Sequence, residues 1–242
     1  MKILKNALVI TPTVYGEHFS DAIQSVADQT HLATDMLCVL DGVSDSDFPY
    51  NIDFPITVME LPWNVGKDGG NWYGHRVYAS IPKLIPEKYE YIFFLDEDNT
   101  FEPNHVESCI EAIEKNDKLD FVHSLRRVVD KDGNFLCNDD CESLGRYPIM
   151  GKTGHHLIDT SSYCFKRDFI RKTCHFWDSG WGGDRRYLAS IINTMGWDTM
   201  GQTGEYTLNY RLDGNEGSVT KEFFLEGNKE TKEDRPWAKK SV

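Results

Sequence analysis

The feature that most constrains the fold of this chain is the segment Tyr91–Asp98, which reads YIFFLDED. Its first five residues are apolar and mostly aromatic or β-branched, which predicts a strand buried on both faces, as in a parallel sheet. Three carboxylates follow without a break. A buried strand that ends in acids delivers them to the carboxyl edge of an open α/β sheet, where such sheets bind ligands. Because hard divalent cations prefer oxygen ligands, this edge is a candidate metal site.

The composition is that of a globular chain, with 40% hydrophobic and 12% aromatic residues among 242. This length allows one large domain with a sizeable core. The formal net charge of −13 argues against nucleic acid and anionic membranes as main partners, because both bind basic patches. A phosphate ligand stays possible, since a bound metal ion reverses the local sign of the charge.

The sequence shows no run of about 20 apolar residues, so we expect no membrane span. The N-terminal residues read as a strand rather than a signal peptide, which favours a cytoplasmic protein. The six cysteines are scattered and are expected to be reduced thiols. Cys137 and Cys141 flank an acidic loop, but no second pair with the usual zinc spacing accompanies them.

Strands and helices alternate along the first half of the chain, which predicts βαβ units and a mostly parallel sheet with helices on both faces. We expect one α/β domain over residues 1–212 and a polar C-terminal arm over 213–242, with a polar loop at 130–156. The expected strands are 7–11, 36–40, 56–61, 91–95, 121–129 and 158–165, and the expected helices are 20–29 capped by Ser20, one reaching about residue 80, 104–114 capped by Asn104, and 181–195.

Polar side chains follow four of the expected strands. They belong to Thr11–Thr13, Asp41, Asn64 and Asp96–Asp98. Because these strand ends share one edge of the predicted sheet, we expect the side chains to lie together. Asn64 also opens a glycine-rich segment that has neither P-loop nor dinucleotide-binding spacing, so we exclude both of those phosphate motifs.

The order of these motifs resembles the family 2 glycosyltransferases, which have the Rossmann-like GT-A fold. The series ITPT, AIQSVADQT, VLDG, NVG and LDED carries the resemblance over roughly the first 125 residues. Further on, DTSS from Asp159 and WGGDRRYL from Trp181 are similar to acceptor-side segments of such enzymes, the second to their Gly-Glu-Asp-type motif. Two positions depart from the pattern: Gly183 stands where an acid often precedes the Asp, and Asp41–Gly42 replaces the usual Asp pair.

The resemblance implies a metal-dependent, inverting hexosyltransferase that moves a sugar from a nucleotide diphosphate sugar, with UDP favoured, to a carbohydrate or other hydroxyl acceptor. Residues 1–129 would form the nucleotide-sugar-binding half and 130–212 the acceptor half. Asp96 and Asp98 would hold Mn2+ or Mg2+, and Asp184 would be the general base. The implied donor-binding residues are Thr11, Pro12, Thr13, Tyr15, Asp41, Asn64, Lys67, Arg76, Asp96 and Glu97.

Some residues are candidates for acceptor or phosphate contacts: His156, Asp159, Trp181, Gly182, Gly183 and Arg211. Each has a structural interpretation as well. Trp181 could stack on a sugar or fill the core at a helix start. Asp184 could be an N-cap instead of a base. His155 and His156 are adjacent, so in a strand they would point to opposite faces and could not easily share one ion.

Two other functions stay open at this point. A sugar nucleotidyltransferase uses a related sheet and acid pair, but it normally has a basic, glycine-rich loop after the first strand, and Tyr15–His18 lacks that character. A non-catalytic nucleotide-sugar-binding protein would keep the strand-end acids without needing Asp184. An activity assay with nucleotide sugars separates these from a transferase.

Overall fold

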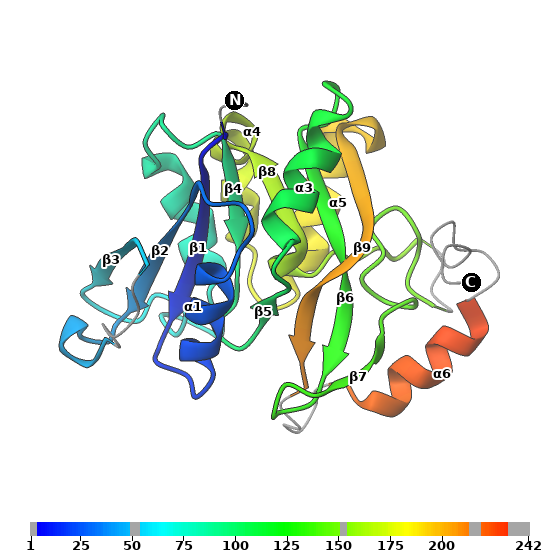
Figure 1. Ribbon diagram of the computed structural model, residues 1–242, viewed down its shortest axis with the longest axis horizontal. Coiled ribbons are helices and arrows are strands. Elements are labelled where there is room, and N and C mark those ends of the chain that lie inside the picture. The colour runs from blue at the N-terminus through cyan, green and yellow to red at the C-terminus, as the bar shows by residue number, and fades with distance from the viewer. Residues whose placement is uncertain (1–3, 49–53, 151–153, 213–218, 232–242) are drawn as a thin grey trace.

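The fold was analysed in a computed structural model that describes residues 4–48, 54–150, 154–212 and 219–231 (Figure 1). These residues form a nine-stranded sheet in the order β3-β2-β1-β4-β8-β6-β9-β5, with β7 paired to β6. Helices pack on both faces of the sheet, and each face has its own hydrophobic core between the sheet and the helices. The predicted α/β class is confirmed.

The N-terminal half of the sheet is parallel. It contains β1 (Ala7–Thr13), β2 (Thr34–Asp41), β3 (Ile56–Leu61) and β4 (Tyr91–Phe94). Every residue of β1 is buried, as expected of a central strand covered on both faces. Val9 lies opposite Met36 on one side and Phe93 on the other, so the three strands run to the same edge in register.

The second half of the sheet mixes directions. β8 (Tyr163–Lys166) runs antiparallel between β4 and β6 (Phe121–Val129), and β9 (Met200–Arg211) runs parallel to β6. Two short antiparallel strands complete it: β5 (Thr100–Phe101) on β9 and β7 (Phe135–Asn138) on β6. The prediction of a strand from residue 158 is wrong at its start, because Thr160–Ser162 form a 3-10 turn in which Asp159 accepts a hydrogen bond from the Ser161 amide at 2.8 Å.

The helices divide between the two faces. α1 (Phe19–Ala27) and α3 (His105–Glu114) lie on the viewer's side of the sheet in Figure 1. α2 (His75–Ser80), α4 (Arg167–Thr173) and α5 (Gly183–Met195) pack on the other face. The predicted caps are wrong in detail: Ser20 lies inside α1, and Asn104 precedes α3 but its side chain donates to Glu205 rather than capping the helix.

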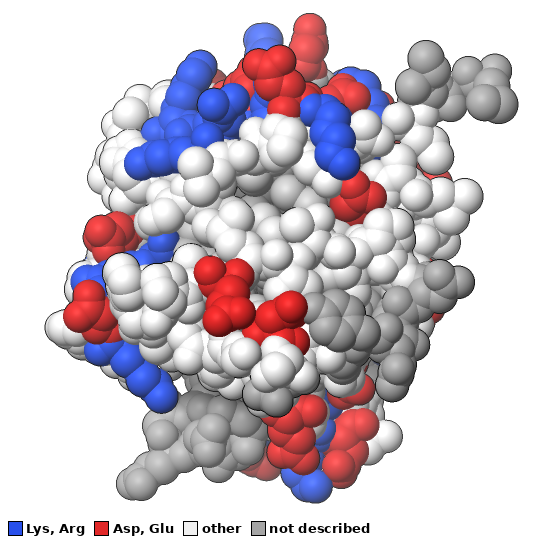
Figure 2. All heavy atoms as spheres, turned by 90° about the vertical axis from the view of Figure 1, so that its left-hand side faces the viewer, with Lys and Arg blue, Asp and Glu red and all other residues white. Residues whose placement is uncertain are grey.

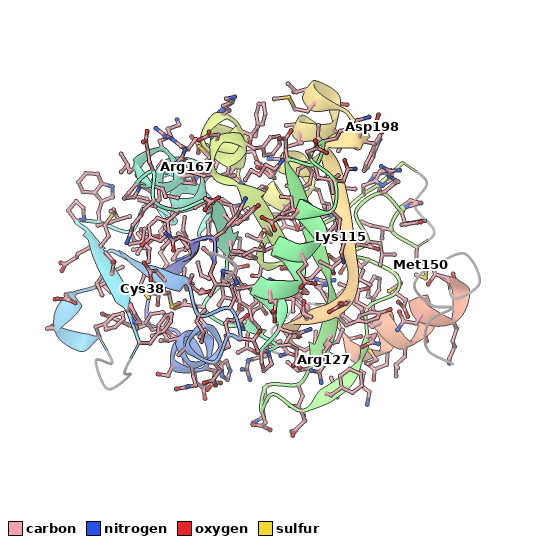
Figure 3. The ribbon with its side chains drawn as sticks, turned by 45° about the horizontal axis from the view of Figure 1, so that its top comes forward. Cys38, Lys115, Arg127, Met150, Arg167 and Asp198 are labelled. Carbon is pink, nitrogen blue, oxygen red and sulfur yellow. The ribbon has the colours of Figure 1, made fainter. Side chains whose placement is uncertain are left out.

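The predicted C-terminal arm contains a packed helix, α6 (Lys221–Thr231), within its described part. Phe224 of α6 is fully buried with Val128 and Cys141, and Met150 lies beside the helix (Figure 3). The Thr231 hydroxyl donates to the Asp140 carbonyl at 2.8 Å. The described part of the predicted polar arm therefore packs against the domain, because a buried aromatic residue anchors an otherwise polar helix.

The surface of the protein and the state of its cysteines agree with the expectations from the composition. None of the helices in the described ranges is long and apolar enough to cross a membrane. Figure 2, which faces the β3 side, shows Lys and Arg side chains gathered along its upper margin and a largely uncharged middle with a few acids. All six cysteines are free thiols, as predicted; Cys38 lies in β2 (Figure 3) and is buried.

Candidate functional site

A cavity of about 430 Å³ opens at the carboxyl edge of β1, β2 and β4. The strand-end segments singled out from the sequence meet there, although Thr11 is fully buried beneath the cavity instead of lining it. The lining residues are Pro12, Thr13, Val14, Asp41, Asn64, Gly66, Lys67, Asn71, Tyr73, Gly74, His75, Asp96, Glu97, Asp98, Asn99 and Tyr210. We call this space the acidic cavity, because four of its lining residues are carboxylates.

Asp96 is the most perturbed of these acids. Its Oδ1 accepts a hydrogen bond from the Tyr78 hydroxyl at 2.9 Å, and Oδ2 accepts one from Ser161 at 3.3 Å. Burial raises the pKa of Asp96 to about 8, and the nearby Asp98 and Asp159 add to the rise. Asp96 therefore holds a proton at neutral pH until a positive charge arrives. Asp98 is exposed at the cavity surface.

Glu97 points away from Asp96 and stabilises the loop after β1 by hydrogen bonds. One oxygen of its carboxylate accepts hydrogen bonds from the Thr13 hydroxyl and from the amides of Gly16 at 2.9 Å and Val14 at 3.2 Å. Tyr15 in this loop has a left-handed backbone, with φ of 62°, and its hydroxyl donates to the Ser44 carbonyl at 2.8 Å. Tyr15 does not line the cavity, and its predicted donor contact stays a prediction.

Asp41 and Asn64 organise the loop after β3. The two Asp41 oxygens accept the amides of Val65 at 2.7 Å and Gly66 at 3.0 Å. The Asn64 side chain accepts the Lys67 amide at 2.8 Å. Each carboxylate oxygen of Asp41 keeps a second lone pair, so this structural role leaves room for a ligand N–H. Asp41, Asn64 and Lys67 all line the acidic cavity.

Arg76 does not reach the cavity. Its guanidinium lies over the Trp72 ring at 4.2 Å and donates to the carbonyls of Asp68 at 2.6 Å and Val65 at 3.2 Å. These contacts hold the glycine-rich loop from outside. Arg76 also pairs with Asp178 at 3.5 Å, and its predicted contact with base, ribose or phosphate stays a prediction.

The segment around Asp184 opens α5 and adjoins the cavity through His75. Gly182 has φ of 72°, and Gly183 lies so close to the ring that an added Cβ would be 2.6 Å from Nδ1 of His75. A side chain at position 183 is thus excluded by the imidazole. Trp181 is 72% exposed, so its interpretation as a core residue is wrong.

Asp184 is in the first turn of α5, whose N-cap is Gly182. Its Oδ1 accepts the amide of Arg185 at 2.7 Å. Burial raises the pKa of Asp184, the Arg185 amide opposes the rise, and Asp159 adds to it. Burial lowers the pKa of His75. A raised pKa strengthens a carboxylate as a proton acceptor, which is the property a general base needs.

Arg126 forms a buried group that sequence reasoning missed. Its guanidinium contacts Asp139 at 2.9 Å, Glu142 at 2.8 Å and Asp159 at 2.8 Å, and lies over the Tyr210 ring at 4.2 Å. We call these four charged residues the Arg126 cluster. The signal in the sequence was an arginine inside the apolar strand FVHSLRRVV. Asp159, a predicted acceptor contact, is one of its ion-pair partners.

Two other weak candidates lie away from the acidic cavity lining. Arg211 donates to the carbonyls of Asp98 at 2.9 Å and Lys131 at 2.7 Å, and to Asp21 at 3.0 Å. It holds the backbone of Asp98 in place, and its predicted phosphate contact stays a prediction. His156 lines a second cavity, where its ring lies 4.8 Å from that of Trp197, and its predicted acceptor or phosphate contact stays a prediction.

The acid pair Asp96 and Asp98 has donor atoms of the kind that a divalent cation prefers. Asp96 and Asp98 offer carboxylate oxygens, and Lys67 is the one Lys or Arg among the described residues lining the cavity. Among all described residues, no group of three or more His, Cys, Asp or Glu side chains is arranged to hold a metal ion.

Residues 9–169 match the family described as Glycosyl transferase family 2. The chain belongs to this family. A segment of 78 residues is 38% identical to an uncharacterised protein of Haemophilus influenzae, covering 32% of this chain and 49% of that protein.

Solved structures confirm the GT-A fold of this family 2 chain. The structure of S. aureus TarS residues 1–349 matches it with a TM-score of 0.61 and 13% identity over 85% of this chain and 60% of that one. The mannosyltransferase PcManGT from Pyrobaculum calidifontis matches with a TM-score of 0.50 and 14% identity, over 81% of this chain and 56% of that one. The family 2 chain thus spans about half to 60% of the length of these relatives.

Proposed function

We propose that this protein is a metal-dependent, inverting glycosyltransferase that uses a nucleotide diphosphate hexose, with UDP as the nucleotide, and a carbohydrate hydroxyl as acceptor. The observation that carries the proposal is the meeting of Thr13, Asp41, Asn64 and the Asp96–Asp98 acids at one cavity in a family 2 chain. The separation of these residues in the sequence makes their convergence informative.

Structures similar to this chain have been solved with such donors. S. aureus TarS 1–349 was determined in complex with UDP and with UDP-GlcNAc, and PcManGT in complex with GDP-Man and Mn2+. Asp41 would accept an N–H of the base, since both of its oxygens keep a lone pair beside the cavity. Asn64 and Lys67 would contact ribose or phosphate from the same loop.

Asp96 and Asp98 would hold Mn2+ or Mg2+ together with the diphosphate. When bound, such an ion supplies Lewis-acid stabilisation of the negative charge on the leaving diphosphate. Asp96 would contribute to metal binding by releasing its proton. Because its pKa is raised to about 8, this release depends on the arrival of a positive charge. Tyr78 and Ser161 orient its two oxygens. The backbone of Asp98 is held by Arg211.

Asp184 would act as the base for the acceptor. The acceptor oxygen attacks the anomeric carbon, the bond from that carbon to the diphosphate oxygen breaks, and the hydroxyl proton passes to the Asp184 carboxylate. A single displacement of this kind inverts the configuration. The raised pKa of Asp184 makes its carboxylate a stronger base than an ordinary surface Asp. The exposed Trp181 indole offers a stacking surface for a sugar ring.

The family assignment favours a glycosyltransferase over a sugar nucleotidyltransferase. Turnover distinguishes a glycosyltransferase from a non-catalytic nucleotide-sugar-binding protein, because the latter would bind the donor without transferring the sugar. Release of UDP from a panel of UDP-hexoses, with Mn2+ and a mixture of acceptor sugars, measures that turnover directly.

Donor binding tests the role of Asp98. Asp98→Asn should weaken Mn2+-dependent UDP binding at least tenfold, because the variant removes one of two carboxylate ligands, while Tm stays near the wild-type value. Calorimetric titration of UDP, with Mn2+ or with EDTA, measures the effect. The matched control is Asp117→Asn, since Asp117 is an exposed acid away from the cavity. Equal UDP affinity in Asp98→Asn, wild type and EDTA-treated protein would contradict the metal role.

A further inference from the structure

A second cavity of about 400 Å³ lies on the other side of the first turn of α5 from His75. Arg185 and Arg186 of α5 line one side of it, and His155 and His156 line the other. Trp197 completes it, with its ring 4.8 Å from that of His156 in a tilted, edge-to-face contact. We call this space the basic cavity.

The two cavities are similar in size and opposite in charge. The acidic cavity is lined by four carboxylates and one lysine, whereas the basic cavity has two arginines, two histidines and no Asp or Glu among its described lining residues. The chain as a whole has 39 acidic and 26 basic residues, so an acid-free lining runs against its composition. Such a lining indicates an anionic ligand.

The charge of Arg185 is only weakly compensated within the protein. Its closest carboxylate contact is Glu142 at 3.5 Å, through an oxygen of a group that already pairs with Arg126 at 2.8 Å. The Arg185 side chain is 44% exposed and can reorient toward a ligand. Arg186 differs, because it donates to the Ser179 carbonyl and so fixes the loop before α5.

The basic cavity adjoins the reacting position by way of the helix. Arg185, Ala189 and Ile192 recur at the spacing of one helical face and line the cavity together. Asp184 immediately precedes Arg185, while Gly183 packs on His75 of the acidic cavity. Asp184, the proposed base, thus lies in the sequence between a residue that packs against His75 of the acidic cavity and a residue that lines the basic cavity.

We propose that the basic cavity binds the anionic group of a phosphorylated or carboxylated carbohydrate acceptor, an inference that rests on the proposed transferase function. Arg185 pairs with the anion, since its guanidinium matches phosphate and carboxylate oxygens in a bidentate geometry. His155 donates to the same anion from the facing segment. Trp197 and His156 supply aromatic surface for the sugar ring. A neutral sugar of the same size can accept hydrogen bonds from Arg185 but carries no charge to pair with its guanidinium.

Binding of glucose 6-phosphate, compared with glucose, tests the inference in the full-length protein with UDP and Mn2+ present. We expect glucose 6-phosphate to bind at least tenfold more tightly than glucose, because a charged hydrogen bond contributes about that factor or more. Arg185→Gln and His155→Gln should each remove most of this preference with unchanged Tm. Glucuronate in place of glucose 6-phosphate shows whether a carboxylate or a phosphate is the better anion.

The matched control is Arg171→Gln, which removes an exposed arginine of α4 outside the basic cavity and should leave the preference intact. Equal binding of glucose, glucuronate and glucose 6-phosphate to the wild type would overturn the inference. So would an equal loss in Arg171→Gln and Arg185→Gln, which would show general attraction to positive charge. Titration of UDP alone reports on the proposed function separately, so either idea can fail without the other.

Discussion

The Arg126 cluster and the acidic cavity hold acids of the same kind in opposite electrostatic states. In the cluster, Asp139 lies against a guanidinium and accepts the amides of Cys141 at 3.0 Å, Glu142 at 2.8 Å and Ser143 at 2.9 Å. Although burial works against it, Arg126 and these amides lower the pKa of Asp139. In the cavity, burial and neighbouring acids raise the pKa of Asp96 to about 8.

Ser161 links the two groups. Its amide donates to Asp159 of the cluster at 2.8 Å, and its hydroxyl donates to Asp96 of the cavity at 3.3 Å. The pKa values of Asp139 and Asp96 therefore shift in opposite directions because, of the two groups, the cluster has a cation against its acids. The comparison teaches that a carboxylate whose charge is compensated within the protein maintains structure, whereas an uncompensated one leaves its charge for a ligand to neutralise.

The largest expected effect comes from removing the cation of the cluster. Arg126→Met should lower the free energy of unfolding by about 3–5 kcal/mol, because three buried carboxylates lose their shared partner. The control is Arg127→Met, since the neighbouring Arg127 is half-buried and pairs with Glu102 near the surface, where a salt bridge contributes about 0–1 kcal/mol. Urea unfolding of both variants measures the difference, and similar losses would break the distinction between the two regions.

The second-largest expected effect is on catalysis by Asp184, near the acidic cavity with its uncompensated acids. Asp184→Asn should reduce sugar transfer by about 10²–10⁴-fold while UDP binding is kept, because an amide cannot take the acceptor proton. Asn retains an oxygen that accepts the Arg185 amide, so helix α5 should keep its stability. Steady-state transfer rates and Tm separate a base from a structural acceptor. Near wild-type transfer in the variant would assign Asp184 to the helix start alone.

The smallest expected effect is a gain in stability, whereas the first prediction was a loss of stability. A folded-state pKa raised from 3.8 to about 8 means that ionising Asp96 opposes folding, and stability is lost as pH rises through this window. Asp96→Asn should therefore raise Tm by a few degrees at pH 8 and leave it nearly unchanged at pH 4. Thermal melts at the two pH values check this. A lower Tm at pH 8 would show that Asp96 is compensated after all.

The sequence allowed the acidic cavity to be predicted because each of its acids comes directly after a strand. Asp41 and Asp96 could be placed by the position of a strand end alone. The Arg126 cluster could not, because its partners are up to 33 residues away and only tertiary packing brings them together. The contacts of Arg76 and Arg211 with backbone carbonyls could not be predicted for a related reason: sequence position does not show which carbonyls accept an arginine's hydrogen bonds.

Two parts of the fold were missed for local reasons. β9 alternates Tyr206, Leu208 and Tyr210 along its second half, but Gly201 and Gly204 interrupt the pattern at its start. α6 carries a polar pattern in which Phe224 is the fully buried side chain. In both elements the stabilising contacts come from distant residues, so local periodicity carried little information.

The place of β9 in the sheet has a consequence for the order in which the chain can fold during synthesis. β9 is the last strand in the described chain, yet it lies between β5, which is made about a hundred residues earlier, and β6, which is made about eighty residues earlier. Until the ribosome has released residues 200–211, β5 has no strand to pair with and Asp98 lacks the arginine that holds its carbonyl. The nascent protein thus contains every acid of its binding edge well before it can fix their positions, and the last strand completes both the sheet and the site in one step.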